Sequence, residues 1–276
     1  MPELPEVETV RQTLKNFVLN QKIENIEIYY QNIVDGDCEE FKHILISQSI
    51  IDIKRVGKYL IFELENDNFI SHLRMEGKYL YVTRDTPIEK HTHLVFQFEN
   101  GMDLRYHDTR KFGRLQLVSK TDYINQEPLN KLGKEPFDLS ADEFYSSIRY
   151  SNLPIKTVLL DQTKIAGLGN IYANEVLFRA RIHPLTKASN LSKNKCQLLI
   201  HQSIDVLNEA ISQGGTTIRS FSSNGIHGLF TQQLNVHGKE NEPCPCCEYP
   251  IMRKKINGRS AYYCTKCQKI IYKRKK

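Results

Sequence analysis

Four cysteines near the carboxyl end of the 276-residue chain constrain its fold more than any other feature. They form two Cys-x-x-Cys pairs separated by sixteen residues: Cys244 with Cys247, and Cys264 with Cys267. A Cys-x-x-Cys turn places two sulfurs on one side of a metal, and a hairpin can return two more. The spacing predicts a zinc ribbon that binds one Zn²⁺. Because four thiolates leave no open coordination position, we expect this zinc to be structural.

The stretch between the two pairs is expected to form the ribbon's hairpin, since Asn257-Gly258 is a strong signal for a two-residue turn. Cys246 lies inside the first pair and could compete as a ligand. We prefer Cys244 with Cys247, because this choice keeps the two-residue spacing in both pairs.

Positive charge gathers at the same end of the chain. The net charge is +6, yet residues 241–276 carry ten Lys or Arg and two Glu, so residues 1–240 are slightly acidic. Such an end favours a polyanionic partner, with nucleic acid ahead of anionic lipid. A solubilising tail is the alternative, and the cysteine pattern argues against it. Four of the cations lie on the expected hairpin: Arg253, Lys254, Lys255 and Arg259.

The remaining cysteines and the chain start indicate the compartment. Cys38 and Cys196 are isolated, and we expect both to be core residues. An odd total of seven cysteines argues against disulfides. The start carries glutamates where a secretory signal would carry basic and then apolar residues, and no run of eighteen apolar residues exists. We therefore expect a cytoplasmic protein without a membrane span.

Hydrophobic periodicity divides the chain into an α+β succession. Residues 3–19 read as a helix and residues 21–119 as a block of short strands, which is typical of a β-sandwich or barrel. The boundaries that we predict are a domain at 1–125, a linker at 126–139, a helical domain at 140–237 and the zinc module at 238–276. Helices are expected at roughly 140–149, 155–161, 169–179 and 190–213, and a mobile loop at 214–240.

The second residue is a proline, and this matters if Met1 is removed. The chain would then begin with a free secondary amine, which can attack a carbonyl-like carbon and form an iminium intermediate. Glu3 and Glu6 lie close by, three residues apart on the predicted helix, where one could transfer protons while the other orients. Taken alone, such a segment is more often a plain helix start than an active site.

The start MPELPEVETVR closely resembles that of the bacterial formamidopyrimidine-DNA glycosylases (MutM). Further segments resemble the same family, in the same order along the chain and ahead of the cysteine ribbon: VGKYL at 56–60, HLRMEGKY at 72–79, HDTRKFG at 107–113 and KIAGLGNIYANE at 164–175. The resemblance implies an N-terminal β-sandwich with a leading helix, then a helix–two-turn–helix domain that ends in a zinc finger. It also implies a substrate: double-stranded DNA that contains an oxidised purine, such as 8-oxoguanine or a formamidopyrimidine.

The same resemblance implies a set of catalytic residues. Pro2 would attack C1′ of the damaged nucleotide, displace the base and form a Schiff base, and β,δ-elimination would follow. Glu3 resembles the family's acid/base residue, and Glu6 its supporting carboxylate. Lys58 resembles the lysine assigned to proton transfer and phosphate contact, although outside this context it would read as a surface strand lysine. Arg259 resembles the arginine that grips phosphates and is assigned to δ-elimination.

Three further residues match the family's wedge, which fills the hole left by the extruded nucleotide: Met75, Arg110 and Phe112. Extrusion costs a few kcal/mol of stacking and pairing. An apolar or aromatic side chain recovers stacking, and a guanidinium can bind the orphaned base. Without the family pattern, Met75 and Phe112 would be placed in the core.

The remaining DNA contacts are also implied by resemblance. Lys156 and Asn170 match phosphate-binding positions, and His91 matches a DNA-contacting histidine. The loop at 214–240 lies where the family carries a base-capping lid. One departure from the family pattern is Glu248, which stands where glycine is frequent.

Two alternatives stay open from the sequence. The first is the sister activity of endonuclease VIII, which acts on oxidised pyrimidines; the wedge residues and the PELPEVE start favour oxidised purines instead. The second is a zinc-ribbon DNA-binding protein without catalysis. Nothing in the sequence suggests an assembly device, so we expect a monomer.

Overall fold

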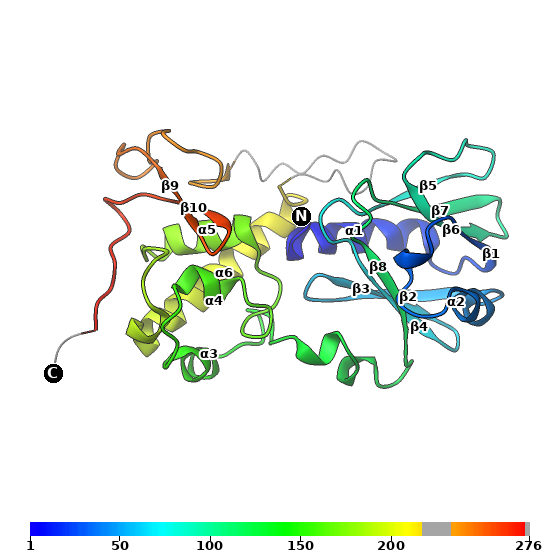
Figure 1. Cartoon of the computed structure of the whole chain (residues 1–276), viewed down its shortest axis with the longest axis horizontal. Helices are drawn as coiled ribbons and strands as arrows, with labels where there is room; N and C mark the ends of the chain where they lie inside the picture. Colours follow the sequence, from blue (N-terminus) through cyan, green and yellow to red (C-terminus); the bar gives the residue numbers. More distant parts are fainter. Residues whose placement is uncertain (217–232, 274–276) are drawn as a thin grey trace. The chain divides into compact units, whose positions relative to one another are not determined.

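A computed structural model of the protein describes residues 1–216 and 233–273, and these fall into two compact units (Figure 1). The first unit comprises Met1–Asn130 with residues 213–216, and the second comprises Lys131–Ser212 with residues 233–273. The division after Asn130 lies inside the segment 126–139 that the sequence analysis assigns to a linker. Most of the predicted mobile loop, at 217–232, lies outside the described residues, and the four-part domain division stays a prediction.

The chain begins with the expected helix, α1 (Leu4–Val18), in place of the predicted 3–19. Pro5 lies in its first turn, where a missing N–H costs no hydrogen bond. Val7, Val10 and Leu14 recur on one face and are buried in the core of the first unit.

Two antiparallel four-stranded sheets follow (Figure 1). One has the order β1 (Ile23–Ile28), β6 (Thr92–Phe98), β7 (Met102–His107) and β5 (Lys78–Thr83). The other has the order β2 (Ile50–Val56), β3 (Tyr59–Leu64), β4 (Asn68–His72) and β8 (Arg114–Val118). Phe69 of the second sheet stacks on Phe96 of the first, with ring centroids 5.2 Å apart. The inner faces therefore share one core, and the predicted β-sandwich is confirmed.

One helix interrupts the block that the sequence predicts to be strands. It is α2 (Cys38–Leu45), which buries Phe41 against the sandwich core. The Asp37 carboxylate caps it by accepting from the Glu40 N–H at 2.8 Å. Cys38 begins this helix and packs, partly buried, against the edge of the core rather than within it; Cys196 is fully buried, as predicted.

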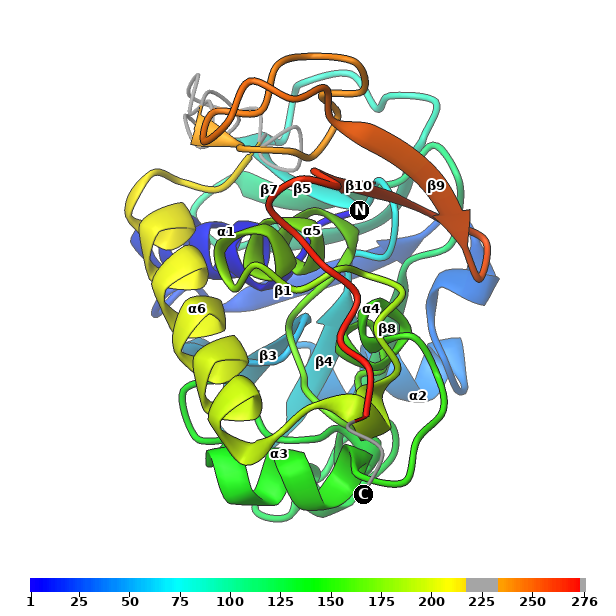
Figure 2. The same ribbon diagram turned by 90° about the vertical axis from the view of Figure 1, so that its left-hand side faces the viewer.

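The second unit contains the four predicted helices, α3 (Ala141–Ile148), α4 (Ile155–Leu159), α5 (Asn170–Arg179) and α6 (Lys193–Ser212). It also contains the hairpin of β9 (Met252–Ile256) and β10 (Arg259–Tyr263), which lies beside α5 (Figure 2). Across the two units, the described residues also form short 3₁₀ turns: η1 (Gln31–Ile33), η2 (Tyr123–Asn125), η3 (Leu129–Lys131) and η4 (Ala188–Asn190). In the hairpin turn Asn257 and Gly258 have φ of 44° and 77°, the type I′ geometry expected of Asn-Gly.

Among the described residues, none of the helices combines the length and the apolar character that crossing a bilayer requires.

Candidate functional site

The amino-terminal end of α1 brings Pro2, Glu3 and Glu6 together. All three are buried, whereas Met1 is exposed. The Glu3 N–H donates to Oε2 of Glu6 at 2.8 Å, within a reciprocal capping box between the two residues. Two buried carboxylates therefore lie next to Pro2, the residue predicted to be the nucleophile.

The Glu6 carboxylate also holds the segment that leads into the predicted lid. Its Oε1 accepts from the N–H of Thr216 at 2.9 Å and from the Thr216 hydroxyl at 3.0 Å. Gly215 has a φ of +78°, and a Cβ there would lie 2.7 Å from Glu6 Oε1, so only glycine fits. With both oxygens engaged, Glu6 is suited to orienting its neighbours.

Lys58 occupies the two-residue turn between β2 and β3, after Gly57, whose φ is +58°. Its side chain is only 5% exposed, unlike that of an ordinary surface lysine. Lys58 lies close enough to His72, at the end of β4, to lower the pKa of that imidazole. The structure thus places a buried lysine near the imidazole of His72.

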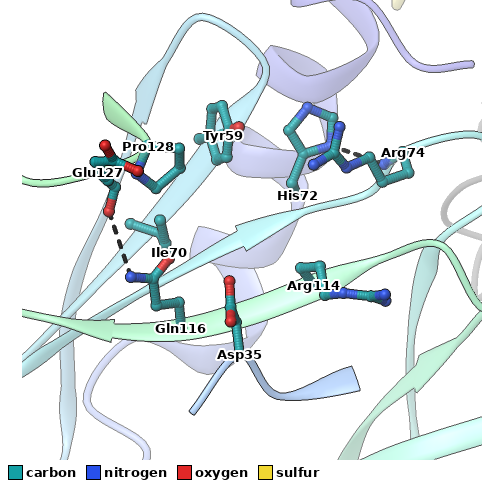
Figure 3. Close-up of a pocket in the computed structure, with 9 residues that line it drawn as sticks. All are labelled: Asp35, Tyr59, Ile70, His72, Arg74, Arg114, Gln116, Glu127 and Pro128. Carbon is teal, nitrogen blue, oxygen red and sulfur yellow. Dashed lines mark hydrogen bonds between the residues drawn. The ribbon is translucent and has the colours of Figure 1, made fainter. Parts of the chain in front are cut away.

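His72 is held as a neutral ring. Burial first, and then the charges of Arg74 and Lys58, lower its pKa to about 3. Its Nδ1 accepts from the Arg74 N–H at 2.9 Å and so fixes the start of the following loop (Figure 3). Beside it lies a hollow of about 180 Å³, lined by Asp35, Tyr59, Ile70, His72, Arg74, Arg114, Gln116, Glu127 and Pro128. Ligand pockets usually exceed ~300 Å³, so we assign no ligand to it.

The residues predicted to form the wedge lie on two loops of the first unit, which we call the wedge loops. Met75 is on the β4–β5 loop, and Arg110 and Phe112 are on the β7–β8 loop. Phe112 is 48% exposed, and the Arg110 guanidinium lies 4.7 Å from the centre of its ring. The aromatic ring and the guanidinium are therefore presented at the surface together.

A buried carboxylate shapes the β7–β8 loop. Asp108 is fully buried and accepts three backbone N–H bonds, from Arg110 at 2.9 Å, Phe112 at 2.9 Å and Gly113 at 2.8 Å. Its own N–H donates to the carbonyl of His91 at 3.0 Å, which places His91 next to this loop. Asp108 thus fixes the backbone at both exposed wedge residues.

Tyr106 packs between the two loops. A Cβ at Gly77 would lie 2.1 Å from its hydroxyl oxygen, and a Cβ at Gly113 would lie 1.7 Å from it, so both positions require glycine. The Thr109 hydroxyl also donates to the Glu76 carboxylate and joins the loops directly. The structure therefore brings the Met75 loop and the Phe112 loop together.

Each wedge loop carries a residue in the left-handed region. Arg74, which precedes Met75, has a φ of 51°, and Lys111, between Arg110 and Phe112, has a φ of 58°. Such strain in a non-glycine residue costs on the order of 1 kcal/mol or more and is common at functional sites.

In the second unit, Lys156 is buried on α4 and donates its ammonium to the carbonyl of Ser260, next to Arg259. Arg259 itself is exposed at the start of β10. Asn170 is the first residue of α5, after the N-cap Gly169. Lys156 thus holds the hairpin through one N–H of its ammonium. Because an ammonium has three N–H donors, the predicted phosphate contact is compatible with this bond and stays a prediction.

The four predicted metal ligands converge. The Sγ atoms of Cys244, Cys247, Cys264 and Cys267 lie within 4.8 Å of one another, with close approaches of 3.4, 3.5 and 3.9 Å. A tetrahedral zinc with Zn–S bonds near 2.3 Å requires S–S separations of roughly 3.8 Å. Cys246 is exposed and outside the group. The geometry therefore fits one metal ion bound by the predicted set.

Glu175 of α5 anchors the approach to this cluster. Its buried carboxylate accepts the backbone N–H groups of Asn235, Val236 and His237 at 2.8 to 3.0 Å. Glu248, the departure from the family pattern, has a φ of 61°. A position that favours glycine is therefore occupied by a residue with a side chain.

The residues that have a structural part in this site but are not predicted from the sequence include His72, Tyr106 and Asp108. His72 and Asp108 lie inside the segments 72–79 and 107–113 that resemble the family. This resemblance is the signal that could have identified them. Their parts depend on hydrogen bonds and packing that the sequence does not display.

Comparison with known families agrees with this architecture. The model of the formamidopyrimidine-DNA glycosylase N-terminal domain matches residues 1–115, and that of the formamidopyrimidine-DNA glycosylase H2TH domain matches residues 132–222. A helix-led sandwich, an H2TH domain and a four-cysteine ribbon define the class of H2TH DNA glycosylases. The chain belongs to the formamidopyrimidine-DNA glycosylase family.

Individual relatives match over almost their whole length. Formamidopyrimidine-DNA glycosylase of Oceanobacillus iheyensis is 45% identical over 273 residues, which cover 97% of this chain and 98% of the relative. Solved structures of Lactococcus lactis Fpg, one with abasic-site DNA and one with N7-benzyl-Fapy-dG DNA, match with a TM-score of 0.92. They are 42% and 43% identical, and each match covers 97% of this chain and 100% of the other.

Proposed function

We propose that the protein is a bifunctional DNA glycosylase and abasic-site lyase that excises oxidised purines from duplex DNA in base excision repair. The observation that carries this proposal is the chain start, where Pro2 lies buried beside the carboxylates of Glu3 and Glu6. The structural relatives in complex with abasic-site DNA and N7-benzyl-Fapy-dG DNA support the same substrate class.

The chemistry starts after removal of Met1. The lone pair of the neutral Pro2 nitrogen attacks C1′, and the bond from C1′ to the damaged base breaks. Opening of the sugar gives an iminium, which acidifies the C2′ protons. Loss of a C2′ proton breaks the 3′ phosphate bond, and a second elimination breaks the 5′ bond.

The neighbouring groups divide the remaining work. Glu3 donates and accepts protons at the sugar, and Glu6 orients the chain start and Thr216. Lys58 is buried next to His72 and assists phosphate contact and proton transfer during elimination. Arg259, exposed on the ribbon hairpin, grips phosphates and assists the second elimination.

Binding uses both units. Met75, Arg110 and Phe112 fill the hole left by the extruded nucleotide. Lys156, Asn170 and His91 contact the DNA backbone. The four cysteines bind one structural Zn²⁺, which holds the hairpin of Arg259 and takes no part in bond breaking. The enzyme works as a cytoplasmic monomer on nucleoid DNA.

Borohydride trapping tests the nucleophile. With abasic-site duplex, protein that lacks Met1 is expected to give a covalent adduct, which mass spectrometry assigns to Pro2. Fusion of a tag to the amino terminus is expected to abolish the adduct, while the same tag at the carboxyl terminus serves as the matched control. An adduct of unchanged yield on the amino-terminally tagged protein would overturn the assignment.

Base excision tests the substrate class. Excision of 8-oxoguanine opposite cytosine is expected to exceed that of thymine glycol, and the reverse order would indicate the endonuclease VIII activity. Glu3→Gln is expected to remove excision while lesion binding is kept. Binding without any strand cleavage by the wild-type protein would leave only a DNA-binding role.

A further inference from the structure

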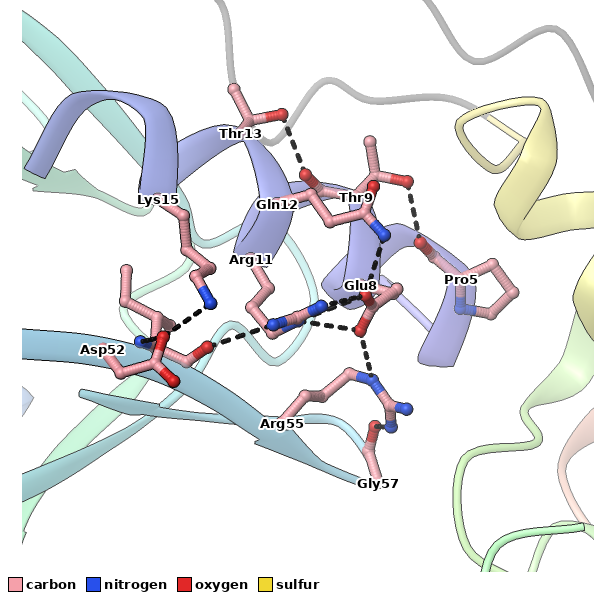
Figure 4. Close-up of polar contacts among 11 residues, drawn as sticks. Pro5, Glu8, Thr9, Arg11, Gln12, Thr13, Lys15, Asp52, Arg55 and Gly57 are labelled. Atoms are coloured by element: carbon pink, nitrogen blue, oxygen red, sulfur yellow. Dashed lines mark hydrogen bonds and ion pairs between the residues drawn. The ribbon is translucent and has the colours of Figure 1, made fainter. Parts of the chain in front are cut away.

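The carboxylate of Glu8, in the second turn of α1, links this helix to β2 of the second sheet through hydrogen bonds. It is 8% exposed. Its Oε1 accepts from Arg11 Nη2 at 2.6 Å and from Gln12 Nε2 at 2.9 Å. Its Oε2 accepts from Arg11 Nε and from Arg55 Nε, each at 3.0 Å (Figure 4). One buried carboxylate thus gathers two guanidiniums and an amide.

Each arginine also donates a hydrogen bond to a backbone carbonyl, one in β2 and one in the turn that follows it. Arg55 Nη1 donates to the carbonyl of Gly57 at 3.0 Å, and Arg11 Nη1 donates to the carbonyl of Ile53 at 3.2 Å. Gly57 is the first residue of the two-residue turn and directly precedes Lys58. The path from Glu8 through Arg55 therefore ends on the turn that carries the buried lysine.

The charge state of Glu8 suits this arrangement. Burial alone would raise its pKa, but hydrogen bonds from Arg11, Gln12 and Arg55 hold the pKa below the ordinary value. A buried ion pair is weak evidence for stability, because desolvation offsets much of the attraction. It does fix geometry, since a bidentate guanidinium restricts both distance and orientation.

We propose that Glu8 is a positioning residue: through Arg55 it holds α1, which directly follows Pro2 and Glu3, in register with the turn that presents Lys58. The inference rests on the proposed function, in which Pro2 and Lys58 act on one sugar. A misplacement of about 1 Å between reacting groups can cost on the order of a hundredfold in rate.

The test substitutes Glu8→Gln, which keeps the shape, removes the charge and places an amide donor against the arginines. The single-turnover rate of strand cleavage at a preformed abasic site is expected to fall about tenfold or more. The Kd for duplex with an uncleavable abasic analogue is expected to stay within twofold, because no DNA contact changes. Glu8→Asp, which keeps the charge, is expected to recover part of the rate.

The same helix and strand provide a matched control. Lys15 and Asp52 form an ion pair at 2.6 Å between α1 and β2, farther from the chain start (Figure 4). Asp52→Asn breaks this partly exposed pair and is expected to leave the cleavage rate within twofold. Cleavage rates that are equal in Glu8→Gln and Asp52→Asn would overturn the inference.

Folding and function are kept apart by two further measurements. If Glu8→Gln does not fold, as judged by circular dichroism, Arg55→Gln replaces it, because this change removes the link to Gly57 and leaves Arg11 on Glu8. An equal rate in Arg55→Gln and Asp52→Asn then overturns the inference. Wild-type protein that forms no Pro2 adduct with borohydride would remove the proposed function itself, whereas a normal wild-type adduct leaves only the role of Glu8 in question.

Discussion

The two units hold their functional loops by different means. In the sandwich unit, buried carboxylates accept several hydrogen bonds each: Glu6 from the chain start and Thr216, and Asp108 from three N–H groups of the wedge loop. In the ribbon, four thiolates converge on one point suited to a metal ion. The first arrangement depends on a complete surrounding fold, because the carboxylates are positioned by the sandwich. The second depends on a single ion.

This difference teaches how each region should fail. A carboxylate that shapes a loop leaves several backbone N–H groups without an acceptor when it is removed, and each buried one costs about 1–3 kcal/mol. A ribbon with little core of its own loses its fold when the metal leaves. Damage to one region should therefore leave the other intact.

The largest expected effect is loss of the metal. Cys264→Ser, or chelation of the wild-type protein, should release zinc, unfold the β9–β10 hairpin and lower DNA affinity at least tenfold. Structural zinc contributes roughly 10–16 kcal/mol in zinc-finger peptides. Amide hydrogen exchange should show the sandwich strands unchanged. Cys246→Ser is the matched control, since Cys246 is exposed and outside the cluster; equal zinc loss in both variants would contradict the ligand set.

The next effect concerns Asp108. Asp108→Ala should lower the free energy of unfolding by about 3 kcal/mol, because three backbone N–H groups, one buried and two partly buried, lose their acceptor. Excision of 8-oxoguanine from duplex should fall about tenfold, while cleavage at an abasic site in single-stranded DNA, which has no hole to fill, should change less. Asp85→Ala removes an exposed carboxylate of the same unit and is the control. Equal losses on both substrates would argue against a role in the wedge.

A smaller effect follows from the neutral His72. Its pKa in the folded protein is lowered to about 3, below the 6.5 of an ordinary histidine. Between these values the unfolded chain binds a proton that the folded chain does not. The free energy of unfolding should therefore fall as the pH drops below 6.5, by up to about 1.4 kcal/mol per pH unit from this residue. The His72 imidazole resonances should not titrate from pH 8 to 5 in the folded protein, but should do so in urea.

The smallest effect lies in the ribbon. Glu248→Gly should remove the strain that a side chain suffers at φ 61°. The zinc module should gain less than about 1 kcal/mol of stability, because glycine also has more conformational freedom in the unfolded chain. Gly258→Ala should instead destabilise the module, because Gly258 has a φ of +77°. An added Cβ would meet no atom within 4 Å, so backbone strain is the expected cause. The midpoint of thermal zinc release measures both, and shifts of the same sign would exclude backbone strain as the cause.

The sequence by itself determined the features that are local. The spacing of Cys244, Cys247, Cys264 and Cys267 predicts the four thiols that converge in the structure, and Asn257-Gly258 predicts the hairpin turn, because both depend on residues close together in the chain. The leading helix and the four helices of the second unit follow from hydrophobic periodicity. The strand block hid α2, although Asp37 and Glu40 carry its capping signal.

Only the tertiary structure decided which distant groups meet. The burial of Lys58 and Lys156, the bond from Glu6 to Thr216, and the packing of Tyr106 against Gly77 and Gly113 join residues from separate segments. A carboxylate such as Asp108 or Glu8 looks like any surface acid in the sequence, because burial and hydrogen-bond partners are properties of the folded chain. The spacing of residues along the chain therefore predicts the cysteine cluster and the hairpin turn. The three-dimensional fold decides which carboxylates are buried and which donors they bind.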